Sequence, residues 1–300
     1  MKILNQFQGC LIGLALGDAM CAPFEGGVIE RKLWKVIGTT KNNKIRYTDD
    51  TQMTMDVASS LIQHQGINQD ALAKKFAESY QWSRGYGPTA AKLLKGIKRG
   101  KDWRKLNKKY FKDGSFGNGA AMRVAPVALV YSKKSTKQLF VNVKKTAVIT
   151  HAHPDAIIGA YNIAFAIAAM LNGKQQSFLE QLIAINHERY QYKLELARDW
   201  LQSDDAISKK DIVYYLGNGI QAMESTVTAI YIAMRFLQSD YSEMIAFIQK
   251  LGGDSDTIAA MSGAIWGAKN GLHAIKQEDV IHLEAKDKIL SLAEQLTTLT

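Results

Sequence analysis

The sequence predicts an all-α protein that forms a single domain over residues 1–300. Apolar residues recur three or four positions apart along much of the chain, which is the period of an amphipathic helix. Alternating runs typical of strands are scarce, and residues 32–37 are the one weak candidate. No low-complexity linker or shift in composition marks a domain boundary. A chain of 300 residues is long enough to bury a substantial core, so we expect one compact helical bundle.

The helical periodicity is clearest in a series of segments separated by glycine-rich breaks. Ahead of them, an N-terminal helix is expected to end near Gly17-Asp18 and to lead into the loop Pro23 to Gly27. The expected helices then follow at 50–65, 69–82, 118–132, 137–149, 155–171, 177–189, 220–238 and 254–271. The breaks at 26–27, 85–87, 114–119, 217–219 and 252–253 each precede a helical stretch. The loops of functional interest are therefore expected to lead into helix N-termini.

The last of these segments, 254–271, is rich in small side chains. It contains Ala259, Ala260, Ser262, Gly263, Ala264, Gly267 and Ala268. Small residues let neighbouring helices approach closely, so we expect this helix to be central and buried. Its acidic N-terminus would then lie at the base of a pocket.

Composition is that of a globular enzyme from a reducing compartment. Hydrophobic residues make up 47% and charged residues 22% of the chain. Cys10 and Cys21 are too few for a disulfide framework; buried thiols are expected, with a bridge between them as the alternative. The apolar run 10–16 is too short for a signal peptide, and we expect no segment that spans a bilayer. The chain is predicted to be cytoplasmic, although an exported effector would have the same features.

The net charge of +10 comes largely from a basic run between Lys92 and Lys112. Its members include Lys95, Lys98, Arg99, Lys101, Arg104, Lys105, Lys108 and Lys109. Such a run is most often a solvated face. The alternatives are an acidic partner or the steering of an anionic substrate. No recognised DNA- or RNA-binding motif accompanies it.

Two acidic runs, 48–51 (TDDT) and 254–257 (DSDT), are the first candidates for chemistry. Aspartate and threonine at a helix start can simply cap the helix. One aspartate suffices for capping, however, and each run has two that would repel each other without a cation between them. Carboxylate and hydroxyl oxygens select Mg, Mn or Ca over Zn. If the fold joins the two runs, they would form an oxygen cage for divalent metals.

The glycine-rich segment 114–119 (GSFGNG) precedes a helical run, and its backbone N–H groups can close on a phosphate there. The order of its glycines fits neither a dinucleotide fingerprint nor a P-loop. A flexible loop with a glycine cap is the alternative. Phe116 within this segment would either stack on a base or pack against neighbouring side chains of the protein.

Two further sites carry weaker signals. His151 and His153 lie ahead of a helix but lack the further ligands of a zinc site. We expect both histidines to be structural; the alternative is that one of them forms a hydrogen bond with a substrate. Glu25, between Phe24 and Gly26, is either solvated or poised over a metal site as base or gate.

These stretches, in this order, resemble the ADP-ribosylglycohydrolase family (the dinitrogenase-reductase-activating glycohydrolase type). The matching segments are 17–26 (GDAMCAPFEG), 47–54 (YTDDTQMT), 114–126 (GSFGNGAAMRVAP), 150–156 (THAHPDA) and 252–268 (GGDSDTIAAMSGAIWGA). Segments 84–88 and 217–235 are most similar to the branch called ADP-ribosylhydrolase 3. That branch acts on O-linked ADP-ribose, including ADP-ribosylserine and poly(ADP-ribose).

The resemblance implies an all-α bundle with two Mg or Mn ions at its centre. The implied metal ligands are Thr48, Asp49, Asp50, Asp254, Asp256 and Thr257. Glu25 matches a mobile glutamate that covers the metals, and Glu25, Asp49 and Asp256 are the implied catalytic residues. The implied substrate-binding residues are Gly85, Gly87, Asp113, Gly114, Ser115, Phe116, Gly117, Asn118, Gly119, His151 and Ile220. Residues 113–119 would hold the pyrophosphate, with Phe116 in place of a tyrosine that stacks on adenine.

The implied reaction is attack of water on C1 of the ribose, assisted by Glu25 or a ligating aspartate, through an oxocarbenium-like state. The expected partners are an ADP-ribosylated protein, poly(ADP-ribose) or an ADP-ribosylated nucleic acid, and the chain is expected to be a monomer that binds no membrane. An ADP-ribosylarginine hydrolase is the alternative within the family. Alternatives of other classes are a non-catalytic ADP-ribose-binding protein and a nucleic-acid-binding protein. The predicted metal ligands and Glu25 are all present in the sequence, which favours an enzyme.

Overall fold

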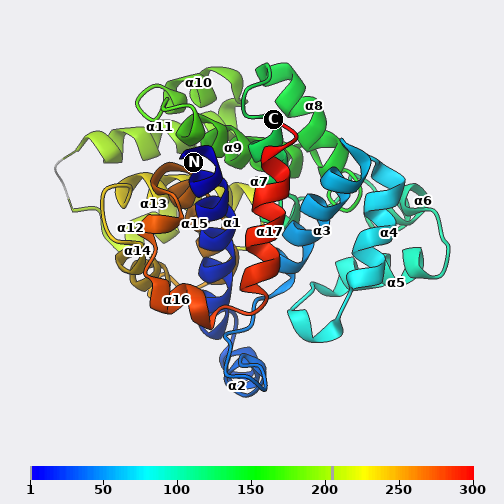
Figure 1. The fold of residues 1–300 in the computed structure, drawn as a ribbon. Coiled ribbons are helices and arrows are strands. Elements are labelled where there is room, and N and C mark those ends of the chain that lie inside the picture. Colours follow the sequence, from blue (N-terminus) through cyan, green and yellow to red (C-terminus); the bar gives the residue numbers. More distant parts are fainter. Residues whose placement is uncertain (1, 204–205) are drawn as a thin grey trace.

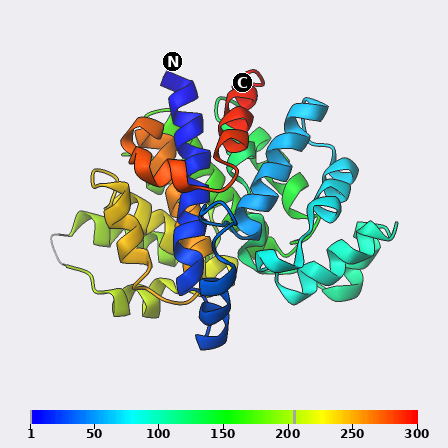
Figure 2. The same ribbon diagram turned by 60° about the horizontal axis from the view of Figure 1, so that its bottom comes forward.

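The computed structural model describes residues 2–203 and 206–300, and this part of the chain is a helical bundle without a β-strand (Figure 1). Extended pairing over these residues is limited to the isolated bridges Thr39–Ile45, Ile45–Leu283 and Gly117–Gln221. The predicted fold class is therefore confirmed. The N-terminal helix and the C-terminal helix lie side by side in both views, with the two chain ends at the same side of the molecule (Figures 1 and 2).

The helices follow one another with short connections. The first half of the chain contains α1 (Lys2–Cys21), α2 (Val28–Ile37), α3 (Asp49–His64), α4 (Gln69–Ser79), α5 (Pro88–Lys98), α6 (Trp103–Tyr110), α7 (Ala125–Tyr131) and α8 (Thr136–Ala147). The second half contains α9 (Pro154–Leu171), α10 (Phe178–Ile185), α11 (Glu188–Gln202), α12 (Lys209–Asp211), α13 (Ala222–Arg235), α14 (Tyr241–Ile248), α15 (Ser255–Asn270), α16 (Gln277–His282) and α17 (Lys286–Thr297). Single turns occur at 22–24, 82–84, 118–120, 212–216 and 272–274.

Helices α1 and α15 form the antiparallel centre of the bundle, and their backbones touch. A Cβ atom built on Gly13 would overlap the carbonyl oxygen of Gly263, and one on Gly17 would overlap that of Ala259. Gly9 and Gly267 meet in the same way one turn further along each helix. Because glycine has no side chain, the two helices approach more closely than any larger residue would allow. The buried central helix predicted at 254–271 is thus confirmed, and its partner is α1.

The other helices surround this pair. Helix α9 packs against α13, α15, α7 and α8, while α17 packs against α1 and α3. Helices α4, α5 and α6 lie along one edge of the molecule in both views (Figures 1 and 2). The start of α3 and the start of α15, which carry the two acidic runs, are held close to the C-terminal end of α1.

Several local predictions were wrong, one in the type of element and two in where a helix begins or ends. Residues 32–37, the weak strand candidate, belong to helix α2. The expected helix 118–132 is broken into a 3₁₀ turn at 118–120 and α7, which begins beside Pro126, a residue suited to the first helical turn. The expected helix 177–189 ends at Ile185, and α11 begins separately at Glu188.

In the described part of the chain, two helical segments, 2–24 and 154–171, are long and apolar enough to cross a membrane by length and composition alone. In each, 78% of the apolar window is buried inside the fold, as expected of core helices. Cys10 and Cys21 are both buried and free, so the expectation of buried thiols is confirmed.

The contact between α1 and α15 makes a prediction about stability. Gly13→Ala should lower the free energy of unfolding by about 2 kcal/mol, because the added methyl group must push the backbone of α15 away. Urea denaturation measures the change. Gly87→Ala is the matched control, since Gly87 has a φ of −55° and a Cβ atom there would meet nothing within 4 Å. Equal effects of the two substitutions would contradict the proposed role of the helix contact.

Candidate functional site

A cavity of about 350 Å³ opens where the starts of α3 and α15 face the glycine-rich loop. Most residues singled out in the sequence line it, although they come from separate parts of the chain. Those residues are Glu25, Asp49, Asp50, Gly85, Gly87, Ser115, Phe116, Gly117, Asn118, Gly119, His151, Ile220, Asp254, Asp256 and Thr257. Thr48, Asp113 and Gly114 do not line the cavity. The fold therefore brings the two acidic runs, the glycine-rich loop and Glu25 to one place.

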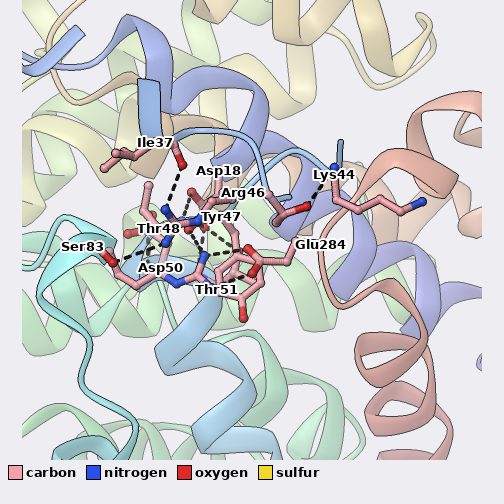
Figure 3. A network of polar contacts seen from close by, with 12 residues as sticks. Asp18, Ile37, Lys44, Arg46, Tyr47, Thr48, Asp50, Thr51, Ser83 and Glu284 are labelled. Carbon is pink, nitrogen blue, oxygen red and sulfur yellow. Dashed lines mark hydrogen bonds and ion pairs between the residues drawn. The ribbon is translucent and has the colours of Figure 1, made fainter. Parts of the chain in front are cut away.

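The buried carboxylate of Asp18, at the end of α1, holds the start of α3 (Figure 3). It accepts hydrogen bonds from the backbone N–H of Thr48 at 2.9 Å and from that of Thr51 at 3.0 Å. The Thr51 hydroxyl donates to the same carboxylate. Thr48 in turn caps α3 by accepting from the N–H of Asp50. Asp18 thus fixes the backbone on both sides of Asp49 and Asp50.

A second buried group, Arg84, contacts the residue that precedes this segment, Tyr47. Its guanidinium donates to the carbonyl of Tyr47 at 2.7 Å and lies 4.0 Å from the centre of the Tyr47 ring. It also forms a two-pronged ion pair with Glu284 at 2.7 and 2.8 Å, and Figure 3 shows Glu284 beside the 46–51 segment. Arg84 directly precedes Gly85, which lines the cavity. It therefore ties the C-terminal part of the chain to both the acidic run and the cavity wall.

The carboxyl groups of the cavity raise one another's pKa. Burial, reinforced by the negative charges around them, raises the pKa of Asp49, Asp50 and Asp256 well above the usual range. Burial and the nearby charge of Glu25 raise the pKa of Asp254 to about 7. Carboxylate oxygens of Glu25, Asp254 and Asp256 lie within 4.8 Å of one another. Such crowding is unfavourable unless protons or cations neutralise it.

The donor set at this position fits hard divalent cations. The available ligand atoms are carboxylate and hydroxyl oxygens, which suit Mg, Mn or Ca. One buried oxygen of Asp50, Oδ2, has no hydrogen-bond partner among the described residues. An orphaned, buried carboxylate oxygen beside further carboxylates is what a cation site without its ion would contain. The donor atoms of this acidic cluster therefore fit a divalent cation.

The glycine-rich loop is fixed to two other segments. Its Asn118 N–H donates to the carbonyl of Ile220, and the Ala222 N–H donates to the carbonyl of Phe116. The Asn118 side chain donates to Asp254 and to the Ser225 hydroxyl. Phe116 and Ile220, 48% and 69% exposed, therefore lie on adjacent segments that border the cavity. Two exposed apolar side chains on a cavity wall are suited to a flat aromatic ligand.

His151 is held in its neutral form. Burial, with the charge of Arg123, lowers its pKa to about 3. Arg123 donates to the Thr150 hydroxyl, and that hydroxyl lies 2.7 Å from His151 Nδ1. Arginine can only donate, so the Thr150 hydroxyl accepts from Arg123, and it can in addition either donate to His151 Nδ1 or accept from it, depending on the tautomer of the ring. The other ring nitrogen, Nε2, is close to Gly117 of the glycine-rich loop.

Arg123, Asp18 and Arg84 contribute to the site but were not among the site residues predicted from the sequence. Arg123 is fully buried and donates to the carbonyl of Gly119 as well as to Thr150. A charged residue inside the apolar run 120–130 was its signal in the sequence. The partners of Asp18 and Arg84 lie 30 and 200 residues away, at Thr48 and Glu284, and no local pattern shows such pairs.

The sequence and the fold of this chain are both similar to those of known ADP-ribosyl hydrolases. The model of the ADP-ribosylglycohydrolase family matches residues 1–300. "ADP-ribosylhydrolase ARH3" of Gallus gallus is 32% identical, covering 89% of this chain and 85% of the relative. The human protein of the same name is 30% identical, covering 98% and 93%. A solved structure described as "ADP-ribosylglycohydrolase-related protein complex" has the same fold, with a TM-score of 0.73 at 22% identity over 100% of this chain and 99% of that one.

The raised pKa values predict how stability depends on pH in the absence of metal. Asp18 and Asp254 have pKa values of about 6 and about 7 in the folded state, against about 3.9 in an unfolded chain. Their contribution to stability is fully present below pH of about 4 and is lost as the pH rises through 6 to 7. His151 acts in the opposite direction below pH of about 6.5, but it is one group against several carboxyls. We therefore expect a higher Tm at pH of about 5.5 than at about 7.5 in the presence of a chelator.

Calorimetry at the two pH values, with and without Mg or Mn, checks this expectation. A bound cation should raise the Tm more at the higher pH, where the carboxyls have lost their protons. A metal-free Tm that rises with pH over this interval would contradict the carboxylate crowding.

Proposed function

The chain belongs to the ADP-ribosylglycohydrolase family, and we propose that it hydrolyses O-linked ADP-ribose, as ADP-ribosylserine or poly(ADP-ribose). The observation that carries the proposal is the composition of one cavity. Crowded carboxyls form part of its wall, a glycine-rich loop forms another, and two exposed apolar side chains border it. With cations bound, the carboxyls would suit a ribose, the glycine-rich loop would suit a pyrophosphate, and the apolar side chains would suit a base.

Six oxygen-bearing residues would hold two divalent cations, Mg or Mn, between the starts of α3 and α15. They are Thr48, Asp49, Asp50, Asp254, Asp256 and Thr257. When bound, such cations polarise and orient the hydroxyls of the ribose to be cleaved. Asp18 and Asn118 hold these ligands in place, the first through the backbone of α3 and the second through the side chain of Asp254. Most of the orientation is thus built into the fold before substrate arrives.

The rest of the substrate would extend away from the acidic cluster. The backbone of 115–119, the part of the glycine-rich loop that lines the cavity, would bind the pyrophosphate, and Gly85 and Gly87 line the same cavity. The imidazole of His151 is neutral at physiological pH, and in the tautomer with its proton on Nε2 it would donate to a ribose or phosphate oxygen. Phe116 and Ile220 would hold the adenine between them. Phe116 supplies the stacking surface of an aromatic ring without a hydroxyl group.

Glu25 is the proposed general base. Its carboxylate lies with those of Asp254 and Asp256, on the loop after α1. Cleavage at C1 of a ribose develops positive charge on the sugar, which the surrounding carboxylates stabilise. Glu25 would accept a proton from the water that attacks C1, and Asp49 and Asp256 would orient the reacting groups. The bond between C1 and the acceptor oxygen would break as the bond to the water oxygen forms, and the acceptor oxygen would leave with the proton that Glu25 took from the water.

The O-linked acceptor is favoured over arginine by the relatives. The proteins named "ADP-ribosylhydrolase ARH3" are about 30% identical over most of the chain. An ADP-ribosylarginine hydrolase with the same acidic cluster remains the alternative. Cytoplasmic location and a monomeric state stay predictions of the sequence.

The experiment that tests the proposal is a panel of substrates assayed with Mg and with Mn. The panel contains an ADP-ribosylserine peptide, an ADP-ribosylarginine peptide, poly(ADP-ribose), O-acetyl-ADP-ribose and ADP-ribosylated DNA ends. We expect metal-dependent release of ADP-ribose from the serine peptide or from the polymer. Release from arginine alone would overturn the O-linked assignment and leave the family intact.

Two variants separate the roles of the acidic residues in the same assay. Asp256→Ala should abolish metal-dependent release, at a cost of at least about 10³ in turnover. Glu25→Ala should lose turnover by about 10² to 10⁴ while ADP-ribose still binds. Calorimetric titration with ADP-ribose measures the binding. Turnover by Asp256→Ala without metal, or unchanged turnover by Glu25→Ala, would remove the proposed role of that residue.

A further inference from the structure

The basic run of the sequence forms a helical hairpin whose charge is almost the whole net charge of the protein. Residues 92–112 contain ten lysines and arginines and a single acidic residue, Asp102, in a chain of net charge +10. They comprise most of α5, all of α6 and the short connection between them. The helices pack closely, because Gly96 of α5 leaves room for the side chain of Leu106 of α6. The charge is therefore concentrated on one rigid element.

Both open ends of this hairpin lie at the cavity. At the start of α5, Gly87, Pro88, Thr89 and Ala90 line the cavity, and Leu93 follows one turn later. At the end of α6, Phe111 lines it again. A ligand that leaves the cavity along the hairpin would therefore run beside these two helices.

The cations form stripes on the exposed faces of the two helices. On α5, Lys92 and Lys95 follow Pro88 at intervals of four and three residues, and Arg99, which caps the helix, follows four residues later, so the three lie along one face. On α6, Lys105, Lys108 and Lys109 are spaced in the same way. All six side chains belong to exposed residues, whereas Leu94 and Leu106 are buried on the opposite faces. Regularly spaced positive charges complement a strand with one phosphate per nucleotide.

Few of these cations are neutralised within the protein. Arg104 pairs with Asp70 at 2.7 Å and so anchors the hairpin to α4. Among the described residues, the other nine have no carboxylate partner within 4 Å. Like charges so close together repel one another, which raises the favourable free energy of binding a polyanion.

An aromatic side chain stands close in sequence to the start of the hairpin. Trp82 is 78% exposed and belongs to the turn that leads through Gly85 and Gly87 into α5. Exposed aromatic rings beside a basic surface are the usual means by which proteins bind single-stranded nucleic acid, since every base can stack on them. We propose that the α5–α6 hairpin is a docking surface for single-stranded nucleic acid beside the mouth of the cavity.

The docking is independent of sequence, because it uses phosphate contacts and stacking rather than base edges. It goes beyond the proposed hydrolysis and does not require it. A strand that carries ADP-ribose at its end would be held with that group at the cavity. The hairpin would thereby add an ADP-ribosylated nucleic acid to the acceptors that reach the cavity.

Fluorescence anisotropy with a labelled poly(dT) strand of about 20 nucleotides tests the proposal, over about 50 to 200 mM sodium chloride. The variant Lys105→Gln/Lys108→Gln/Lys109→Gln removes three charges from α6. Its matched control, Lys133→Gln/Lys134→Gln/Lys137→Gln, removes three exposed lysines that do not line the cavity. We expect the α6 variant to bind at least about tenfold more weakly at the lowest salt. Its slope of log affinity against log salt should fall by about 2, because three phosphate contacts are lost.

Turnover of an ADP-ribosylserine peptide, measured on the same samples, should be equal in the wild type and both variants, which also shows that the variants fold. A Trp82→Ala variant should weaken the binding of poly(dT) about tenfold without changing the salt slope. Equal binding by the α6 variant and the control would overturn the proposal. So would tight binding of poly(ADP-ribose) with none of poly(dT). Absence of turnover in every sample would instead contradict the proposed hydrolysis and leave the binding result standing.

Discussion

The backbone contact between α1 and α15 is the constraint on which the site depends. Because the two helices run antiparallel, their contact places the C-terminal end of α1 beside the N-terminal end of α15. Gly17, which meets Ala259, directly precedes Asp18. Asp18 then binds the backbone of Thr48 and Thr51 and so attaches the start of α3 to the same point. Two acidic runs about two hundred residues apart in the chain meet through one helix pair and one buried carboxylate.

This arrangement places mutually repelling carboxyl groups at the centre of the molecule, which lowers the stability of the metal-free fold. Several carboxyls with raised pKa values surround the cavity, and Asp50 has an oxygen without a partner among the described residues. Burial of the long apolar helices around them offsets the repulsion, and Arg84 with Glu284 holds the neighbouring loop in place. A site that is unfavourable without cations becomes favourable with them. Strain of this kind is typical of functional sites, where stability is given up for preorganisation.

Local patterns predicted much of the fold and of the candidate site. Helical periodicity gave the all-α class, and the stripe of small residues in 254–271 correctly indicated a central helix. The acidic runs and the glycine-rich loop were visible because each exceeds what capping or a plain turn requires. Their meeting at one cavity could not be derived from periodicity, since it depends on packing between helices far apart in sequence. The same limit hid the Arg84–Glu284 pair, the chain of contacts from Arg123 to His151, and the hairpin that the basic run forms.

The central claim is that the starts of α3 and α15 form one cation site. Anomalous diffraction from crystals grown with Mn²⁺ measures this most directly, because it locates the metal without reference to activity. We expect two Mn peaks between Asp49, Asp50, Asp254 and Asp256, within about 2.0–2.6 Å of their oxygens. Peaks elsewhere in the molecule, or an ordered acidic cluster that excludes the metal, would contradict it.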